Sequence, residues 1–250
     1  MPIDVRSIAL LETCIVNIRY VSMDGSDRLP DAGPDREATE NRRLSSPDAR
    51  YGARLRRKST ALLLLDAIIE AETANLERTL TALRADGSLE RAAGQIVAAR
   101  RRFIIGSAKS RAHATLLHLE LSASLSGVAL IDEAAVRAID VLSDVRPTDV
   151  LVAFSFRRYA RQTGTVAREF AAAGGHVVAV TDDADSPLAA AAGTTVVVST
   201  GSASYSDSPT AISAVVHALA TLTAASAKGA RRRLARREDL AHALDIYSDE

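Results

Sequence analysis

The sequence predicts an α/β fold: a three-layer α/β/α sandwich around a five-stranded parallel sheet, preceded by a long helical lead-in. From residue 101 onward, five short apolar runs alternate with helical patterns. The runs are nearly continuous in Val, Ile, Leu and Ala, as expected of strands that are buried on both faces. Right-handed crossovers then place helices on both sides of the sheet, in a doubly wound, flavodoxin-like arrangement.

The first fifty residues do not have the pattern of a folded unit. Residues 3–21 hold one apolar stretch at helical spacing, whereas 22–50 are rich in Pro, Gly, Asp, Ser and Arg. Such a segment buries too little apolar surface to offset the entropy lost on ordering. We therefore expect four parts: a disordered or poorly defined segment at 1–50, a helical lead-in at 51–100, the main domain at 101–227 and a charged C-terminal helix at 228–250.

The lead-in begins with a helix expected over 54–83. Its large apolar residues fall on one stripe: Leu62, Leu65, Ile69, Leu76, Leu80 and Leu83. Gly87 is the expected C-terminal cap of this helix, and Ser88 the N-cap of a second helix that continues to residue 99. The stripe holds more apolar surface than one sheet face covers, which predicts a homodimer or tetramer.

The main domain alternates strands and helices. The expected strands are 103–105, 128–131, 150–154, 177–180 and 195–198. The expected helices are 110–126, 134–142, 161–173 and 208–225, with a terminal helix from residue 229.

Composition excludes several classes of protein. Lys plus Arg and Asp plus Glu each number 31, and this balance argues against a protein that coats nucleic acid. No apolar run approaches the roughly 20 residues of a membrane helix, and no signal-peptide pattern opens the chain. Cys14 is the single cysteine, which excludes an internal disulfide and a cysteine-based zinc site. We expect a cytoplasmic protein without membrane partners.

Ligands of an open parallel sheet bind at the carboxyl ends of its strands, so the loops there are candidate sites. The first such loop holds Gly106, Ser107, Lys109 and Ser110. Glycine allows a sharp turn, and the hydroxyls, the lysine and the amides of a helix N-terminus attract anions. The alternative is a plain turn with Ser110 as the N-cap.

The second loop carries Ser155, Arg157, Arg158, Tyr159 and Arg161 before a helix. Three arginines at a helix N-terminus oppose the helix dipole unless an anion lies among them. We favour an anion site over the alternative, a solvated face on which Tyr159 covers the sheet edge.

The third loop, residues 181–188, contains three acidic residues whose spacing fits no calcium loop. Pro187 is suited to the first position of a helix and Ser186 to its cap, so we interpret this loop as a structural turn. No metal or cofactor is expected here.

Taken together, residues 54–227 resemble the SIS (sugar isomerase) domain of MurR/RpiR-type bacterial transcription regulators. The matching segments are 68–76, 104–107, 148–159, 174–182 and 186–189. The resemblance implies a domain that binds a phosphorylated sugar or sugar acid and signals to an N-terminal helix-turn-helix domain. The alternative function is that of an SIS-type phosphosugar isomerase.

The sequence departs from the family pattern in three places. The G-x-G-x-S loop has Ala108 in place of its second glycine, and the S-x-S-G-x-T loop retains only Ser155. Arginines replace its hydroxyls, and we still expect an anionic ligand. A helix-turn-helix needs about three helical patterns, and residues 1–50 offer one. The domain is therefore missing from this chain or unrecognisable in it, and DNA binding is expected only if a helix-turn-helix is supplied from elsewhere or is present but unrecognised.

An isomerase needs a general base beside the sugar carbons. The candidates are His113, Glu120 and His217, and His217 has the pattern of a core histidine. We expect no enzyme activity. Basic residues crowd the stretch 228–237 and could contact DNA phosphates, but acidic residues follow at once, which favours a solvated or subunit-pairing helix.

Overall fold

The computed structural model describes residues 46–55 and 61–247 of the chain. The chain divides into two units between Asn41 and Arg42, and everything described here belongs to the second unit. Its centre is a five-stranded sheet with the order β2-β1-β3-β4-β5, in which every pair is parallel. The strands are β1 (Arg101–Gly106), β2 (Val128–Ile131), β3 (Asp149–Phe154), β4 (His176–Thr181) and β5 (Thr194–Val197). All five predicted strands are confirmed.

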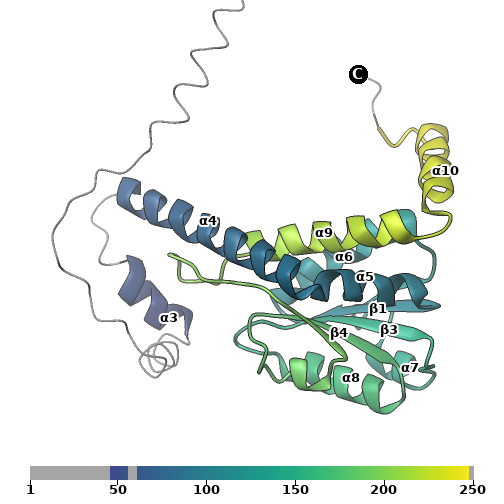
Figure 1. The fold of residues 1–250 in the computed structure, drawn as a ribbon, viewed down its shortest axis with the longest axis horizontal. Coiled ribbons are helices and arrows are strands. Elements are labelled where there is room, and N and C mark those ends of the chain that lie inside the picture. The colour runs from purple at the N-terminus through teal and green to yellow at the C-terminus, as the bar shows by residue number, and fades with distance from the viewer. Residues whose placement is uncertain (1–45, 56–60, 248–250) are drawn as a thin grey trace, which may run out of the picture. The chain divides into compact units, whose positions relative to one another are not determined.

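Helices cover both faces of the sheet (Figure 1). One face carries α4 (Ala61–Asp86), α5 (Ser88–Ala98), α6 (Ser110–Ser124) and α9 (Thr210–Ser226). The other face carries α7 (Ala138–Leu142) and α8 (Arg161–Ala172). Four further elements are α3 (Pro47–Arg50), η2 (Tyr51–Leu55), η3 (Ala189–Ala191) and α10 (Ala230–Ala243). The predicted three-layer sandwich is confirmed.

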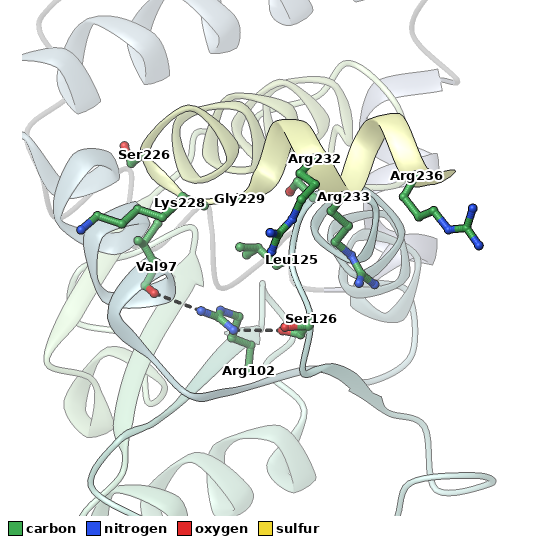
Figure 2. A pocket seen from close by; sticks show the side chains of 12 residues that line it. Val97, Arg102, Leu125, Ser126, Ser226, Lys228, Gly229, Arg232, Arg233 and Arg236 are labelled. Atoms are coloured by element: carbon green, nitrogen blue, oxygen red, sulfur yellow. Dashed lines mark hydrogen bonds between the residues drawn. The ribbon is translucent and has the colours of Figure 1, made fainter. Parts of the chain in front are cut away.

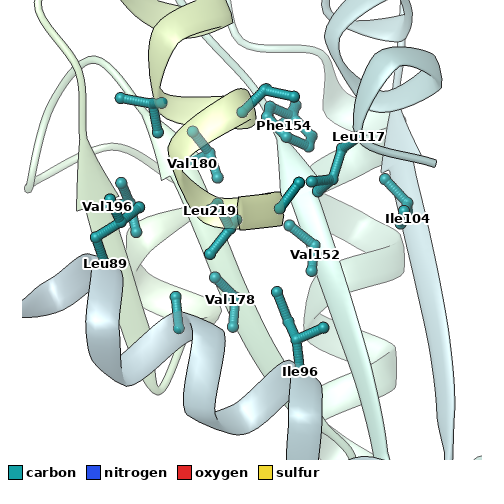
Figure 3. Packing of buried hydrophobic residues seen from close by; sticks show 14 of the residues in the cluster. Leu89, Ile96, Ile104, Leu117, Val152, Phe154, Val178, Val180, Val196 and Leu219 are labelled. Carbon is teal, nitrogen blue, oxygen red and sulfur yellow. The ribbon is translucent and has the colours of Figure 1, made fainter. Parts of the chain in front are cut away.

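Alternate residues of each strand supply two cores. Ile104, Val152 and Val178 point to the side of α5, α6 and α9, where they form the cluster in Figure 3. Phe103 and Leu151 point to the side of α7 and α8. Period-two alternation in strands that are apolar on both faces therefore fixes the sheet between its helical layers.

Some element boundaries differ from the predictions. The lead-in helix begins at Ala61 and ends at Asp86, and residues 51–55 form a π-helix instead. Ser88 is not the N-cap of α5; Gly87, with φ of +64°, holds that position. The Asp86 carboxylate accepts a hydrogen bond from the Ser88 amide at 2.7 Å. Asp86 therefore performs the capping that we expected of Ser88.

The helix predicted over 134–142 is reduced to α7 (Ala138–Leu142). The Asp132 carboxylate accepts the amides of Ala134, Ala135 and Val136 at 2.8–3.1 Å. A side chain that binds its own backbone in this way favours a turn over a helix.

The expectation of disorder at 1–50 falls mostly on residues outside the described ranges. Within the described part, Pro47–Arg50 forms α3, and the Ser46 hydroxyl accepts the Ala49 amide at its start. No single helix in the described ranges is long and apolar enough to cross a membrane, although α9 and α10, bent by 108°, meet that criterion as a pair.

Candidate functional site

The first and second candidate loops lie side by side because β1 and β3 are neighbours in the sheet. The chain reverses direction across the sheet between these two strands, since β2 lies beyond β1 and β4 beyond β3. Doubly wound sheets bind ligands at this switch point. A pocket of about 220 Å³ opens there, which we call the switch-point pocket. Its lining residues are Ser107, Ala108, Lys109, Ser110, His113, Phe156, Arg157, Arg158, Ala160, Asp207, Ser208 and Ile212.

Five of the eight predicted site residues line this pocket: Ser107, Lys109, Ser110, Arg157 and Arg158. Gly106, Ser155 and Tyr159 do not. The Ser107 hydroxyl lies 2.9 Å from the hydroxyl of Thr163 at the start of α8, which ties the first loop to the second. The pocket is therefore lined by residues of both loops.

Gly106 allows the backbone at the start of α6 to approach the end of β1 closely. A Cβ at this position would lie 2.5 Å from the carbonyl oxygen of Ser110, so only glycine lets α6 approach the strand this closely. Ala108 has φ of +51°, a left-handed conformation that favours glycine. The residue that replaces the family's second glycine thus keeps a glycine-like backbone.

The amides at the start of α6 are already used. Those of Ser110, Arg111 and Ala112 donate to the carbonyls three residues earlier, at 3.1–3.2 Å. Ser110 is the first residue of α6, and Lys109 holds the N-cap position without a side-chain cap bond, so the alternative reading of Ser110 as N-cap is wrong. An anion in the pocket would therefore be met by side chains rather than by these three amides.

Residues of the second loop line the pocket, contact the third loop, or do both. The Arg157 guanidinium lies 3.8 Å from Asp182 and 3.9 Å from Asp183. Burial, and then the charge of the neighbouring Asp182 carboxylate, raises the pKa of Tyr159 to about 12. Burial also raises the pKa of Asp182. Tyr159 is thus engaged with a buried carboxylate, and Arg158 is exposed at the pocket.

His113 is a lining residue that the sequence analysis considered only as a base for an isomerase. It is buried on α6, one turn after Lys109, with its ring edge-on to Phe156 at 6.1 Å between centroids. Burial, and then the charge of Lys109, lowers the pKa of His113, so its ring is neutral at pH 7. Its i+4 spacing from Lys109 is the sequence signal that could have placed it in the pocket.

Asp207 and Ser208 also line the pocket, although no motif in the sequence points to them. They lie near the end of the segment 198–209 between β5 and α9, which we call the strap. The Asp207 carbonyl accepts from Lys109 Nζ at 2.5 Å, and its carboxylate lies 2.6 Å from the Arg50 guanidinium of α3. The Ser208 hydroxyl donates to the Glu72 carboxylate of α4.

The other two candidate bases lie away from the pocket. His217 is exposed on α9, not buried as we expected, and its Nδ1 is 3.6 Å from the carboxylate of Glu120 on α6. The carboxylate of Glu120 is thus placed beside this histidine, away from the pocket. Asp207, the one carboxylate among the pocket's lining residues, is held by Arg50.

The third loop has the structure of a turn. The Asp183 carboxylate accepts the Asp185 amide, and the Ser186 hydroxyl accepts the Ala189 amide at 3.2 Å, where η3 begins. Within the described ranges, no group of three or more His, Cys, Asp or Glu side chains could hold a metal ion.

Comparison with known proteins assigns the family. The family model of the SIS domain matches residues 95–222, just over half of the chain. The chain therefore belongs to the SIS domain family. A search of curated proteins found no match.

Solved structures agree with this assignment. The sugar isomerase domain of an RpiR transcription factor from Sphaerobacter thermophilus is 27% identical, with a TM-score of 0.64, and the match covers 69% of this chain and 96% of that one. NanR from Vibrio vulnificus, complexed with ManNAc-6P, is 16% identical, with a TM-score of 0.64 and coverages of 81% and 76%. MJ1247 from Methanococcus jannaschii, for which 3-hexulose-6-phosphate isomerase activity was inferred, is 15% identical, with a TM-score of 0.52 and coverages of 69% and 96%. The resemblance to the SIS domains of RpiR-type regulators is confirmed.

Proposed function

We propose that the switch-point pocket binds a phosphorylated sugar or a sugar acid, and that the chain is the sensing module of an RpiR-like transcription regulator. The observation that supports this most directly is the meeting of Lys109, Arg157 and Arg158 at the switch point of the sheet. Arginine pairs with phosphate and carboxylate through two parallel hydrogen bonds, and lysine adds a mobile charge. The NanR complex with ManNAc-6P indicates that this fold can hold such a ligand.

Sensing is favoured over isomerisation by the acid–base groups of the pocket. An isomerase needs a base that can accept a proton from a sugar carbon. Asp207 is held in an ion pair with Arg50, while Glu120 and His217 do not line the pocket. His113 is the remaining basic side chain, and its lowered pKa makes it a weak base. In this proposal it contributes a neutral hydrogen-bonding ring.

The strap gives the ligand a route to the rest of the chain. A phosphate in the pocket would compete with the Asp207 carbonyl for Lys109 Nζ. Asp207 also holds Arg50, and Ser208 holds Glu72 of α4. Binding would therefore change contacts of α3 and α4, two of the described elements that precede the sheet in the chain. The location in the cytoplasm and a homodimer or tetramer remain predictions, as does DNA binding through a separate helix-turn-helix domain.

Isothermal titration calorimetry with a panel of hexose 6-phosphates, amino-sugar 6-phosphates and sugar acids tests the proposal. We expect at least one compound to bind, and the double variant Arg157→Ala/Arg158→Ala to weaken it by about 10-fold to 100-fold, as the loss of charged hydrogen bonds implies. Arg161→Ala is the matched control, because Arg161 begins α8 but does not line the pocket.

Two results would contradict the proposal. Absence of binding across the panel, or equal affinity in the double variant, would remove the ligand site. Aldose–ketose interconversion detected by proton NMR, and lost in Glu120→Gln or His113→Gln, would replace sensing with isomerisation.

A further inference from the structure

A second, larger pocket lies at the opposite end of the sheet, where β1 and β2 begin. Its volume is about 760 Å³, and five of its lining residues are cationic: Arg102, Lys228, Arg232, Arg233 and Arg236. Its lining contains no Asp or Glu. We call it the cationic pocket (Figure 2).

Arg102 is the buried base of this pocket, with 7% of its surface exposed. Its guanidinium donates to the carbonyls of Ile96, Val97 and Ser126 at 2.6–3.0 Å, at the ends of α5 and α6. Helix C-termini carry partial negative charge, which explains how a cation is held here without a carboxylate. These bonds use three of the five N–H donors of the side chain. A full charge buried with only carbonyl partners leaves the pocket positive.

The other cationic side chains of the pocket are not all paired with carbonyl groups at the helix ends. Arg233 Nε donates to the Ser122 carbonyl at 3.2 Å. In the part of the chain that the structure describes, the side chains of Lys228, Arg232 and Arg236 make no hydrogen bond or ion pair. Glu238 on the same helix does not line the pocket, and its carboxylate lies 3.3 Å from His242.

The three unpaired cations follow one another at intervals of four residues. Arg232 and Arg236 are one turn apart on α10, about 6 Å along the helix axis, and Lys228 lies just before the helix begins. Arg232 and Arg236 therefore share one side of α10, whereas Lys228 precedes the helix and extends away from Arg236 (Figure 2). Cations spread over the lining in this way match an anion with several charged groups better than a single phosphate, which would reach only some of them.

We propose that the cationic pocket binds a small anion that carries two or more linked phosphate groups. Its volume lies within the range of about 300–1,000 Å³ typical of small-molecule sites. Ser226 also lines the pocket and adds a neutral hydroxyl beside the cations. The phosphate chain can be free or part of a nucleotide, since the recognition chemistry is the same. This site is separate from the switch-point pocket and does not depend on its proposed function.

The test is isothermal titration calorimetry of the full chain with sodium tripolyphosphate. We expect saturable binding of one tripolyphosphate per chain, weakened at least about 10-fold in Arg232→Ala/Arg236→Ala. Arg231→Ala/Arg237→Ala is the matched control, since it removes two arginines of the same helix that do not line the pocket. We expect its affinity to stay within about threefold of the wild type, because charges outside the pocket act on its ligand only over a longer distance and are screened by salt. Repeating the titration with Lys109→Ala/Arg157→Ala separates binding at the cationic pocket from any tripolyphosphate held at the switch-point pocket.

Further titrations distinguish a free phosphate chain from a nucleotide, and a small anion from a macromolecule. A nucleoside triphosphate that binds more tightly than tripolyphosphate would support a nucleotide ligand, and equal affinity would support the phosphate chain alone. Inorganic phosphate that binds as tightly would overturn the proposal, as would equal weakening by the two arginine pairs or the absence of saturable binding. Tighter binding of a DNA duplex, or self-association lost only in Arg232→Ala/Arg236→Ala without tripolyphosphate binding, would assign the pocket to a macromolecule instead.

Discussion

Gly106 and Ala108 place different demands on the backbone of one short loop. At Gly106 the limit is space, because a Cβ would lie 2.5 Å from a backbone oxygen of Ser110. At Ala108 the limit is conformation, because φ is +51° and a Cβ is present. The loop that shapes the switch-point pocket is therefore held against local preference by the packing of α6 on the sheet.

We predict opposite effects of exchanging these two residue types. Gly106→Ala should lower the free energy of unfolding by about 2 kcal/mol, since the contacting atom is backbone and cannot rotate away. Ala108→Gly should raise it by up to about 1 kcal/mol, since relief of the left-handed strain exceeds the added entropy of the unfolded chain. Urea unfolding followed by circular dichroism measures both. Equal effects of the two substitutions would contradict this account.

Asp149 at the start of β3 predicts a pH dependence of stability. Burial by itself would raise the pKa of Asp149, but hydrogen bonds from Arg101 and from the Arg146 amide outweigh it and hold the pKa below its usual range. The folded state therefore favours the carboxylate. This stability is fully present above the unfolded pKa of about 3.9 and is lost as the pH falls through the lower folded value.

Asp149→Asn measures that contribution. At pH 7 it should cost about 2–3 kcal/mol, because it removes charge-assisted hydrogen bonds from a buried position. The difference from the wild type should shrink as the pH falls below about 4. Urea unfolding at a series of pH values measures this difference, with Asp185→Asn, at an exposed position of the third loop, as the control. A difference that stays constant with pH would exclude linkage through Asp149.

Side-chain direction explains why only part of the site was predictable. Placement of Lys109, Arg157 and Arg158 followed from the position of their loops after β1 and β3. Ser155 and Tyr159 belong to the same loop, but Ser155 is buried and Tyr159 contacts Asp182. Contacts with the neighbouring third loop decide which residues of the second loop point into the pocket. The sequence of the second loop alone contains no signal for these contacts.

At the scale of elements, the apolar pattern predicted the strands better than the helix boundaries. A buried parallel strand requires a continuous apolar run, and each of the five runs stands alone between polar turns. Helix ends depend on single side chains, as Asp132 shows by binding three amides and replacing the first turn of the predicted helix. The strap was not predictable, because it is held by polar residues of α4.

The face of α4 that packs on the domain is partly polar. Thr79 Oγ1 accepts the Ser199 amide at 3.0 Å, the Asn75 amide donates to the Gly201 carbonyl, and Glu72 accepts from Ser208. Together these bonds fix the strap over the switch-point pocket. The contacts of Asp207 with Lys109 and Arg50 then connect the pocket with α3.

We predict that Asp207→Asn releases α3 without unfolding the domain. Loss of the ion pair with Arg50 should favour local opening by about 1–2 kcal/mol, a factor of about 5–30 in the opening equilibrium. Hydrogen exchange followed by mass spectrometry should show faster exchange at residues 46–55, with β3 unchanged as the internal control. Unchanged exchange at 46–55 would show that the ion pair does not hold this segment.

For the whole molecule, zero net charge is an average over separate regions. Lys109, Arg157 and Arg158 gather at the carboxyl ends of the strands, whereas the cationic pocket lies at the amino ends. The acids are distributed among helix faces and loops. The charge balance therefore excludes a protein coated in nucleic acid, but it is compatible with two local anion sites at opposite ends of one sheet.

The first half of α4 carries the last prediction, which concerns self-association. Leu62, Leu65 and Ile69 are 67%, 51% and 54% exposed, although their spacing forms one apolar stripe. Isolated exposed leucines are ordinary, but a contiguous stripe of this kind marks a protein–protein contact. Because a symmetric dimer pairs the same surface of both copies, the stripe can cover its own counterpart. We predict that the chain sediments as a dimer or a larger assembly.

Leu65→Glu/Ile69→Glu should convert this assembly to a monomer in analytical ultracentrifugation. Each buried aliphatic side chain contributes about 1.5–3 kcal/mol, so losing two raises the dissociation constant more than about 100-fold. The melting temperature of the domain should change little apart from the effect of assembly, because both side chains are exposed in the single chain. Ile139→Glu is the control, since Ile139 is 67% exposed on α7, across the sheet from α4. A wild type that remains monomeric at the highest concentration measured, or a control that dissociates as readily as the double variant, would show that the stripe does not form the interface.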